Sequence, residues 1–262
     1  MMTPGNLSGQ GDRRVALVTG GARGIGLEIV RRLLADGYQV AFVATRAEHV
    51  ERALESLSCP EDRLYAEAID VTRQNEVERF IDRVQARWGD IATLVNNAGI
   101  SPKRADQDAP WLSQMSLEEW ARVIDVNLKG PFILIRLLAP EMIAKGYGRI
   151  INIGSLAGRA MPLIAGPHYA TSKAGLVGLT RAAARDLAPN GITVNCIAPG
   201  RILSDLTGPP EAVVNRSALS RIPVGRFGTA EEVAHVVAFL ASPLAGFITG
   251  ATIDITGGEF AA

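Results

Sequence analysis

Arg14-Val-Ala-Leu-Val-Thr19 is a short apolar run, and Gly20-Gly-Ala-Arg-Gly-Ile-Gly26 follows it directly. The run has the length and composition of a buried strand. From Leu27 to Ala35 apolar residues recur at helical spacing, and Gly37 then provides a stop. A glycine turn between a strand and a helix lets backbone N–H groups approach a pyrophosphate at the helix N-terminus. The spacing is GxxxGxG and not the GxGxxG fingerprint, so a purely structural turn is the alternative, but this position favours phosphate binding.

The alternation of strand and helix continues along the chain. It predicts an α/β fold of one domain: a Rossmann-type, doubly wound parallel sheet with helices on both faces. We expect this domain to span 14–262 and a flexible, polar segment to occupy 1–13. The expected strands are 40–44, 64–69, 93–95, 149–154, 193–197 and 251–255, and the expected helices are 48–57, 74–88, 117–144, 169–187 and 230–240.

The composition is that of an ordinary globular protein. Of 262 residues, 47% are hydrophobic and 21% charged, and Lys+Arg and Asp+Glu both number 27. Because there is no basic block, we expect no nucleic-acid partner. We also expect a cytoplasmic protein without a membrane partner, since the first residues lack the apolar core of a signal peptide and no uninterrupted apolar stretch reaches membrane-spanning length. The histidines lack metal-ligand spacing, so no metal is expected, and Cys59 and Cys196 are expected to be reduced thiols.

A second motif runs from Ser155 to Lys173 and reads Ser-Leu-Ala-Gly-Arg-Ala-Met-Pro-Leu-Ile-Ala-Gly-Pro-His-Tyr-Ala-Thr-Ser-Lys. The strand expected over 149–154 brings Ser155 to its carboxyl end. Tyr169 and Lys173 are four residues apart on the next helix and share one face. An ammonium group beside a phenol favours the phenolate, so we expect Lys173 to lower the pKa of Tyr169 toward the working pH. The tyrosine would then exchange a proton with a substrate whose oxygen Ser155 holds; an ordinary surface Tyr/Lys pair is the alternative.

With these elements the chain resembles the short-chain dehydrogenase/reductase family from Arg14 to Gly258. Each matching motif is weak singly, but their order and spacing together are specific. The resemblance implies an enzyme that transfers a hydride between a nicotinamide cofactor and a ketone or secondary alcohol. The motifs are Thr19-Gly20-xxx-Gly24-Ile25-Gly26, Asp70-Val71, Asn96-Asn97-Ala98-Gly99, Asn127, Ser155, Tyr169-xxx-Lys173 and Pro199-Gly200.

The resemblance also implies four catalytic roles. Tyr169 would be the general acid in ketone reduction and the general base in alcohol oxidation. Lys173 would lower the pKa of Tyr169 and hydrogen-bond the nicotinamide ribose. Ser155 would orient and polarise the substrate carbonyl, and Asn127 would hold a water that links Lys173 to bulk solvent.

A larger set is implied to bind the cofactor. Asp70 and Val71 would meet the adenine, although Asp70 alone also suits a plain helix cap. Asn97, Ala98 and Gly99 would line the adenosine ribose. The remaining predicted cofactor-binding residues are Gly20, Arg23, Gly24, Ile25, Gly26, Thr45, Arg46, Tyr169, Lys173, Pro199, Gly200, Ile202 and Ser204.

The turn after the second expected strand bears on which dinucleotide binds. An enzyme specific for NAD carries an acid there for the ribose 2′-OH, whereas a 2′-phosphate needs cationic partners. This chain has Thr45 in that place and Arg46 next to it, and Arg23 in the glycine turn is a second candidate. Two guanidinium groups around one pocket would repel each other unless a phosphate lay between them. The sequence therefore favours NADP(H), with NAD(H) as the alternative.

The expected substrate pocket is mostly apolar. Three loops, 100–116, 156–168 and 201–227, follow strand ends, where such sheets bind ligands. Arg104, Arg159 and Arg201 lie in these loops with no evident clamp for an anionic substrate. The apolar candidates are Trp111, Leu112, Met161, Leu163, Ile164, Leu203 and Leu206.

The closest subgroup in overall pattern is 3-oxoacyl-[acyl-carrier-protein] reductase. Two departures weaken that match. Carrier reductases tend to place arginines where this chain has Gly146 and Asn190. The interval from Ser155 to Tyr169 is also one residue longer here than the usual spacing in those reductases. We therefore predict a small-molecule ketone or secondary alcohol with an apolar body as substrate. The alternatives are a 3-oxoacyl-[acyl-carrier-protein] or 3-oxoacyl-CoA thioester and, from another class, a non-catalytic dinucleotide sensor.

Two helices point to self-association. The segment 128–143 is apolar around most of its circumference, and the helix after it carries small residues at Ala170, Ala174, Gly175, Gly178 and Ala182. An apolar second face left in water is unusual for a monomer. Members of the resembled family pair these two helices across a two-fold axis and add a second contact near the last strand. We expect a homotetramer, with a dimer as the alternative.

Overall fold

The computed structural model describes residues 14–102, 112–203 and 213–261. The expected flexible segment 1–13 and the candidate residues Arg104, Trp111, Ser204 and Leu206 lie outside this part of the chain. The described residues form a seven-stranded parallel sheet in the order β3-β2-β1-β4-β5-β6-β7. Its strands are β1 (Val15–Thr19), β2 (Gln39–Ala44), β3 (Leu64–Ala68), β4 (Ile91–Asn96), β5 (Gly148–Ile153), β6 (Ile192–Pro199) and β7 (Thr252–Ile255).

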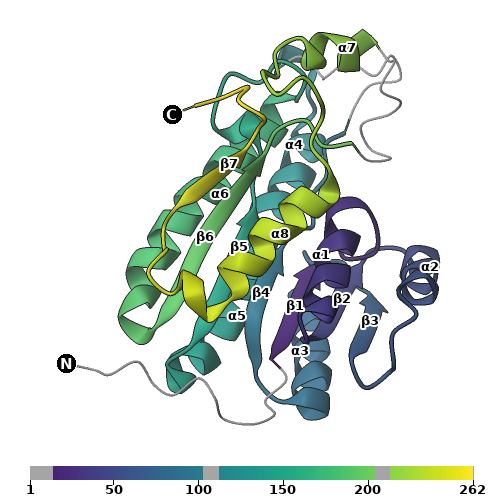
Figure 1. The fold of residues 1–262 in the computed structure, drawn as a ribbon, viewed down its shortest axis with the longest axis vertical. Coiled ribbons are helices and arrows are strands. Elements are labelled where there is room, and N and C mark those ends of the chain that lie inside the picture. Colours follow the sequence, from purple (N-terminus) through teal and green to yellow (C-terminus); the bar gives the residue numbers. More distant parts are fainter. Residues whose placement is uncertain (1–13, 103–111, 204–212, 262) are drawn as a thin grey trace.

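Helices cover both faces of the sheet, as predicted (Figure 1). α1 and α8 lie against one face, and α3, α5 and α6 lie against the other. The helices are α1 (Gly24–Ala35), α2 (Ala47–Leu57), α3 (Gln74–Trp88), α4 (Leu117–Ile124), α5 (Gly130–Lys145), α6 (Pro167–Leu187), α7 (Val213–Leu219) and α8 (Ala230–Ala241). Short 3-10 turns are η1 (Leu112–Gln114), η3 (Leu156–Gly158), η4 (Ala188–Asn190) and η5 (Pro243–Ala245), and η2 (Asp125–Lys129) is a π-helical turn.

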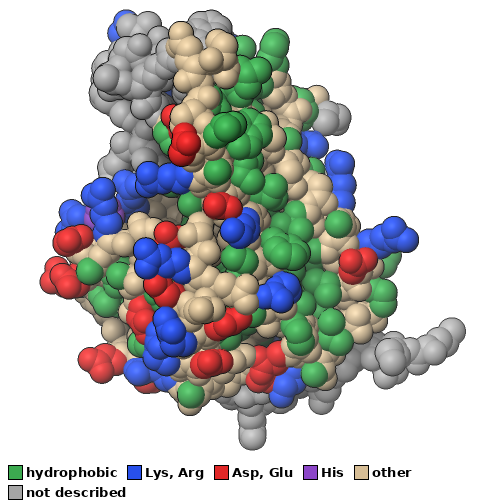
Figure 2. Space-filling view, turned by 180° about the vertical axis from the view of Figure 1, so that it is seen from behind, with side chains coloured by type: hydrophobic (Ala, Val, Ile, Leu, Met, Phe, Trp, Pro, Cys, Tyr) green, Lys and Arg blue, Asp and Glu red, His purple; other side chains and the backbone are tan. Residues whose placement is uncertain are grey.

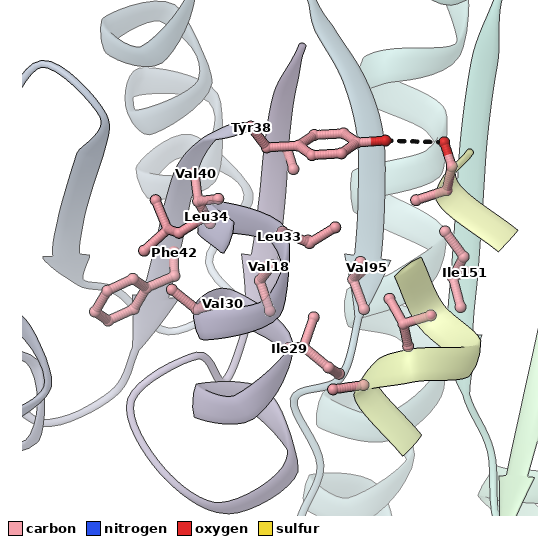
Figure 3. Close-up of a cluster of buried hydrophobic side chains, with 14 of the residues drawn as sticks. Val18, Ile29, Val30, Leu33, Leu34, Tyr38, Val40, Phe42, Val95 and Ile151 are labelled. Carbon is pink, nitrogen blue, oxygen red and sulfur yellow. Dashed lines mark hydrogen bonds between the residues drawn. The ribbon is translucent and has the colours of Figure 1, made fainter. Parts of the chain in front are cut away.

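Alternate residues of each central strand pack into the two apolar layers. On β1, Val18 faces the layer under α1 and α8, while Leu17 faces the layer under α3, α5 and α6. Figure 3 shows the first layer, in which Ile29 and Leu33 of α1 pack toward the sheet. Tyr38 extends across this layer and its hydroxyl donates to the Ala241 carbonyl at 3.1 Å, which joins the end of α1 to the end of α8.

The strand order reverses beside β1. The chain moves outward from β1 to β3, then returns to β4 and moves outward on the other side. Between β1 and β4 the loops at the carboxyl ends therefore diverge and leave a crevice, which is where open α/β sheets bind their ligands. The glycine turn after β1 and the loop after β4 border this crevice.

The helix expected over 117–144 is three segments. α4 ends at Ile124, η2 follows, and α5 begins at Gly130. Pro131 has no N–H to donate to the carbonyl four residues earlier, which interrupts the α-helical pattern there. The wider turn carries Asn127. Two other helices begin earlier than expected, α1 at Gly24 and α6 at Pro167, because the turn glycines and a proline form their first turns.

Candidate active site

Ser155, Tyr169 and Lys173 meet at the carboxyl end of β5. Ser155 caps η3 and accepts a hydrogen bond from the Ala157 amide at 3.1 Å. Lys173 is buried, and its Nζ donates to the carbonyl of Ile153, the last residue of β5, at 2.7 Å. The lysine therefore joins α6 to the strand end that carries the serine.

The Ser155 hydroxyl lies beside the Tyr169 phenol. Burial raises the pKa of Tyr169 above its ordinary value, and the Ser155 hydroxyl opposes this only in part. The Lys173 Nζ lies 5.6 Å from the centre of the tyrosine ring, and burial lowers the pKa of this lysine to about 8. The expectation that Lys173 lowers the pKa of Tyr169 is therefore wrong for this arrangement, because removal of the phenol from water outweighs its polar contacts.

Asn127 is fully buried and links three segments. Its Nδ2 donates to the Ile100 carbonyl at 2.9 Å and to Ser172 Oγ at 3.0 Å, and its Oδ1 accepts from the Ile100 amide at 2.8 Å. A Cβ at Gly99 would lie 3.4 Å from both Asn127 Oδ1 and Lys173 Nζ, so the two polar groups approach the same small space. Ser172, which sequence analysis missed, connects Asn127 to α6.

The glycine turn is held against the loop after β4. Asn97 Nδ2 donates to the carbonyls of Thr19 and Gly20, both at 3.0 Å. Thr19 Oγ1 accepts from the amides of Asn97 and Ala98, also at 3.0 Å. Gly20 has φ +67°, and a Cβ at Gly26 would clash with the Gly20 carbonyl. Glycine is therefore required at these two positions for the turn to adopt this conformation and packing.

Arg23 and Arg46 occupy equivalent positions at two helices. Each is exposed and is the N-cap of its helix, α1 and α2 respectively. An open depression of about 530 Å³ lies beside Arg46, and Arg23 does not line it. Arg52, one of the residues missed from sequence, does line it and also donates to the Glu48 carbonyl at 3.1 Å. The lining residues are Thr45, Arg46, Ala47, Glu48, His49 and Arg52.

Asp70 and Val71 shape the turn after β3. Asp70 Oδ1 accepts from the amide of Thr72 at 2.9 Å and from its hydroxyl at 2.8 Å, while Arg73 is the N-cap of α3. Asp70 is thus not the plain helix cap considered as its alternative; it closes an Asx turn. Val71 is buried, and a Cβ at Gly130 would lie 3.0 Å from its Cγ2, so this side chain packs against the start of α5.

Pro199, Gly200 and Ile202 lie where β6 leaves the sheet. The Gly200 amide donates to the Ile255 carbonyl at 2.9 Å, and Ile202 is buried and bridged to Gly228. This segment therefore runs beside the start of α8, at the edge of the sheet where the strands have their carboxyl ends.

Two half-buried loop arginines are bound by side chains of other segments. Arg159 forms a two-bond ion pair with Asp254 of β7, at 3.1 and 3.0 Å, and Arg201 Nε donates to Asn215 Oδ1 at 2.9 Å. Met161 and Leu163 on the same loop as Arg159 are 81% and 62% exposed, whereas Ile164 packs against a small cluster with Phe227. The described part of the rim therefore exposes apolar side chains, and these two guanidinium groups have partners 95 and 14 residues away.

In the described segments, no three His, Cys, Asp or Glu side chains gather in an arrangement that could hold a metal ion. Within the same segments, no helix is both long and apolar enough to cross a membrane.

The known proteins that this chain resembles match it over nearly its whole length. A family profile described as enoyl-(acyl carrier protein) reductase matches residues 20–259. A 3-oxoacyl-[acyl-carrier-protein] reductase FabG of Staphylococcus epidermidis is 41% identical over 246 residues, 94% of this chain and 98% of that protein. An acetoacetyl-CoA reductase of Rhizobium meliloti is 42% identical over 248 residues, again 94% and 98% of the two chains. The crystal structure of a 3-oxoacyl-[acyl-carrier protein] reductase with bound NAD from Brucella melitensis has 37% identity and a TM-score of 0.88, and covers 96% of this chain and 92% of that one.

The matched region begins at the glycine turn and ends after β7, so it includes the whole crevice and the Ser155, Tyr169 and Lys173 cluster. The similarity also covers nearly the full length of the relatives. Identity of this extent, on the same fold, makes the chain an oxidoreductase of the short-chain dehydrogenase/reductase family, in its FabG-like group.

Proposed function

We propose that the protein is an NADP(H)-dependent ketoreductase that interconverts a ketone and a secondary alcohol, with Tyr169, Lys173, Ser155 and Asn127 as its catalytic set. The observation that carries the proposal is the placement of the Ser155 hydroxyl beside the Tyr169 phenol at the carboxyl end of β5. Two hydroxyl donors side by side are the arrangement that a carbonyl oxygen needs as it gains negative charge.

The residues present fit a nicotinamide dinucleotide. The glycine turn lies at the N-terminus of α1 and beside the switch in strand order, where free backbone amides suit a pyrophosphate. A Cβ at Gly26 would clash with the Gly20 carbonyl, so this turn forms only without a side chain there. When bound, the dinucleotide supplies the hydride. Gly20, Gly24 and Gly26 would surround its pyrophosphate, and Lys173 and Tyr169 would face its nicotinamide end.

In reduction, the protein's own groups stabilise and protonate the substrate oxygen. Ser155 Oγ and Tyr169 Oη donate hydrogen bonds to the carbonyl oxygen, and the phenolic proton moves from Tyr169 to that oxygen as it becomes an alkoxide. The raised pKa of Tyr169 keeps the phenol protonated at neutral pH, which suits the acid role. Lys173, whose Nζ donates to the Ile153 carbonyl, would hydrogen-bond the nicotinamide ribose. Loss of one such donor typically costs about 3–4 kcal/mol of transition-state stabilisation.

The proposed preference for NADP(H) rests on the depression at the start of α2. Thr45 offers no carboxylate there, and Arg46 and Arg52 both line it, which favours a 2′-phosphate. NAD(H) is the alternative, and the Brucella melitensis relative has NAD bound. The experiment is kcat/KM for NADPH and NADH with one carbonyl substrate.

The proposed substrate is a ketone or secondary alcohol with an apolar body, because the described rim is apolar at Met161 and Leu163 and Arg159 and Arg201 are occupied. The second candidate is a 3-oxoacyl thioester, which the names of the FabG and acetoacetyl-CoA reductase relatives favour. Consumption of NADPH with simple ketones, acetoacetyl-CoA and a 3-oxoacyl carrier protein distinguishes them. Tight dinucleotide binding without turnover on any of these would indicate the sensor instead.

We also propose a homotetramer in the cytoplasm. Phe132 and Ile143 of α5 are 50% and 41% exposed, and Leu244 and Phe247, just before the edge strand β7, are 85% and 103% exposed. Figure 2 shows that hydrophobic side chains gather over one half of the molecule's rear face, whereas charged side chains gather over the other half. Two separate apolar regions, on α5 and near β7, suit the two different two-fold contacts of a dihedral tetramer.

A further inference from the structure

A buried histidine lies next to the proposed acid. The His168 side chain is fully buried and bridges α6 and α4. Its Nδ1 accepts a hydrogen bond from the backbone amide of Tyr169 at 2.7 Å, and its Nε2 lies 2.9 Å from Oε1 of Glu119. The mechanism proposed above does not use either His168 or Glu119.

The two contacts determine where the imidazole carries its proton. A backbone N–H can only donate, so Nδ1 must present its lone pair to Tyr169. The proton then lies on Nε2, which donates it to the Glu119 carboxylate. The order of donors is therefore Tyr169 N–H to His168, and His168 to Glu119, and the carboxylate selects the tautomer that the tyrosine requires.

The N-terminus of α6 explains why such a contact is useful. The amides of the first helical turn have no partner within the helix. Gly166 is the N-cap and has no side chain to accept them, and Pro167 has no amide. The imidazole of His168 takes the place of a capping side chain for the one residue whose position matters most, Tyr169.

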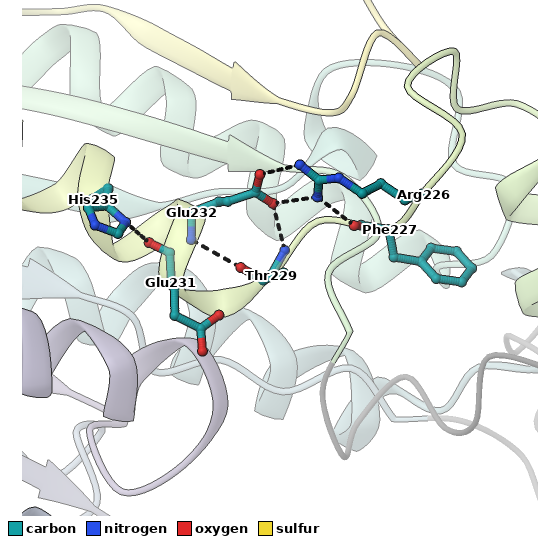
Figure 4. Close-up of polar contacts among 6 residues, drawn as sticks. All are labelled: Arg226, Phe227, Thr229, Glu231, Glu232 and His235. Atoms are coloured by element: carbon teal, nitrogen blue, oxygen red, sulfur yellow. Dashed lines mark hydrogen bonds and ion pairs between the residues drawn. The ribbon is translucent and has the colours of Figure 1, made fainter.

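Glu119 is used differently from its counterpart in α8. In α8, Thr229 Oγ1 accepts from the Glu232 amide, and the Glu232 carboxylate accepts from the Thr229 amide at 2.9 Å, a reciprocal capping box (Figure 4). In α4, Ser116 Oγ accepts from the Glu119 amide at 3.1 Å, the same first half. The Glu119 carboxylate, however, reaches across to α6 and bonds His168.

The carbonyl of Tyr169 is held as well. Ser172 Oγ donates to it at 2.7 Å, and Ser172 Oγ accepts from Asn127 Nδ2 at 3.0 Å. Both peptide groups of Tyr169 are thus tied to the α4–η2 segment, one through His168 and Glu119 and the other through Ser172 and Asn127.

We propose that His168 and Glu119 are a positioning pair that sets the backbone of Tyr169, and with it the phenol, against Ser155 and Lys173. The proposal rests on the function proposed above, in which Tyr169 transfers the proton. A displacement of reacting groups by about 1 Å can cost about 100-fold in rate, so a group that fixes the tyrosine backbone can affect turnover without touching the substrate.

The experiment compares His168→Ala, Glu119→Ala and the double variant with two control variants in α8. Glu232→Ala removes a carboxylate at a helix terminus. His235→Ala removes a surface histidine. We expect His168→Ala to lower kcat about tenfold and Glu119→Ala to lower it less, with little change in KM for NADPH. The double variant should match His168→Ala, because the two residues act in series. The controls should keep the wild-type kcat.

A second pair of measurements separates positioning from plain helix capping. His168→Asn keeps a side-chain acceptor near the Tyr169 amide and should recover part of the lost kcat. Spectrophotometric titration of Tyr169, from the difference between each variant and its Tyr169→Phe form, should show a shifted midpoint in His168→Ala and none in Glu232→Ala.

Three results would overturn the proposal. They are a kcat of His168→Ala within about twofold of wild type, a purely additive double variant, and an unshifted Tyr169 titration. If His168→Ala fails to fold, Glu119→Ala decides, since it leaves the bond to Tyr169 in place. If the wild-type protein reduces no carbonyl compound, the proposed function fails, but the titration still tests the pair.

Discussion

At the scale of single residues, burial dominates the site. It raises the pKa of Tyr169 despite the neighbouring Ser155 hydroxyl, and it lowers the pKa of Lys173 to about 8. Both shifts favour the uncharged form of a group that is removed from water. A protonated phenol is the form required to reduce a ketone, whereas alcohol oxidation requires the phenolate. Oxidation should therefore gain more than reduction from a rise in pH.

The first prediction concerns Tyr169→Phe, which removes the hydroxyl and keeps the ring. We expect a folded protein that binds NADPH and whose kcat falls by about 10²–10⁴-fold, the usual contribution of general acid–base catalysis. Tyr147→Phe is the control, because it removes another phenolic hydroxyl that is buried and has no partner among the described residues. Retention of more than about a tenth of the wild-type kcat by Tyr169→Phe would contradict the assigned role.

The second prediction concerns the stability cost of Lys173. Its folded-state pKa of about 8 lies below its ordinary 10.5, so between these values the unfolded chain binds more protons and stability rises with pH. The full penalty, about 3 kcal/mol, applies below about pH 8 and is partly offset by the bond to Ile153, about 1 kcal/mol. Lys173→Met should thus be inactive yet more stable than wild type at pH 7.

The measurement for Lys173→Met is thermal or denaturant unfolding of both proteins from pH 7 to 10.5. Their difference in stability should shrink across the window from about 8 to 10.5. Lys145→Met, at a side chain that is 60% exposed, should show a smaller change with pH. A difference that stays constant or widens with pH would show that the buried ammonium carries no such penalty.

At the scale of secondary-structure elements, helix N-termini organise the site. α1 begins in the glycine turn, α2 begins beside the depression lined by Arg46 and Arg52, and α6 begins at His168 and Tyr169. The unpaired amides and positive dipole end of a helix suit anionic groups. We therefore propose that the first two helices bind the phosphates of a dinucleotide, and the third carries Tyr169, the proposed proton donor.

The third prediction concerns the start of α2. Arg46→Ala should raise KM for NADPH about tenfold, the loss expected for one hydrogen bond to a charged group, with little effect on NADH. The double change Thr45→Asp with Arg46→Ala should raise it further, because a carboxylate repels the 2′-phosphate. Arg73→Ala is the matched control, since Arg73 is likewise the exposed N-cap of its helix, α3. A wild-type preference for NADH in kcat/KM would refute the charge argument.

At the scale of the whole molecule, α6 has one face on the sheet and another in solvent. Ala174, Gly178 and Ala182 form an exposed stripe of small residues, and a Cβ at Gly178 would have nothing within 4 Å. A side chain added at Gly178 would thus leave the helix surface into open space among the described residues. A second copy packed on this stripe would oppose it.

The fourth prediction follows from that space. Gly178→Trp should fold normally but form a smaller assembly than the wild type, because the indole would prevent close approach of two α6 helices. Ala86→Trp, on the exposed side of α3, is the control and should leave the assembly unchanged. Light scattering at micromolar concentration gives both masses. A wild-type species at the single-chain mass of 27.8 kDa would contradict the tetramer.

Most of the fold was predictable because its signals are local. The apolar run before Gly20 predicted β1, and helical spacing from Leu27 predicted α1, since periodicity and turn residues act over a few positions. The same reasoning placed Tyr169 and Lys173 on one face of α6. It did not predict the π-helical turn around Asn127, because the sequence on both sides of that turn has the pattern of an ordinary helix.

By itself, then, the sequence determined the order of strands and helices, the glycine turn, and the candidates Ser155, Tyr169 and Lys173. Only the tertiary structure decided which distant groups complete the site: Glu119 lies 49 residues from His168, and Asp254 lies 95 from Arg159. It also decided the direction in which the pKa of Tyr169 shifts. The physical reason is that periodicity depends on neighbours along the chain, whereas burial and hydrogen-bond partners depend on segments that meet only when the sheet and its helices pack.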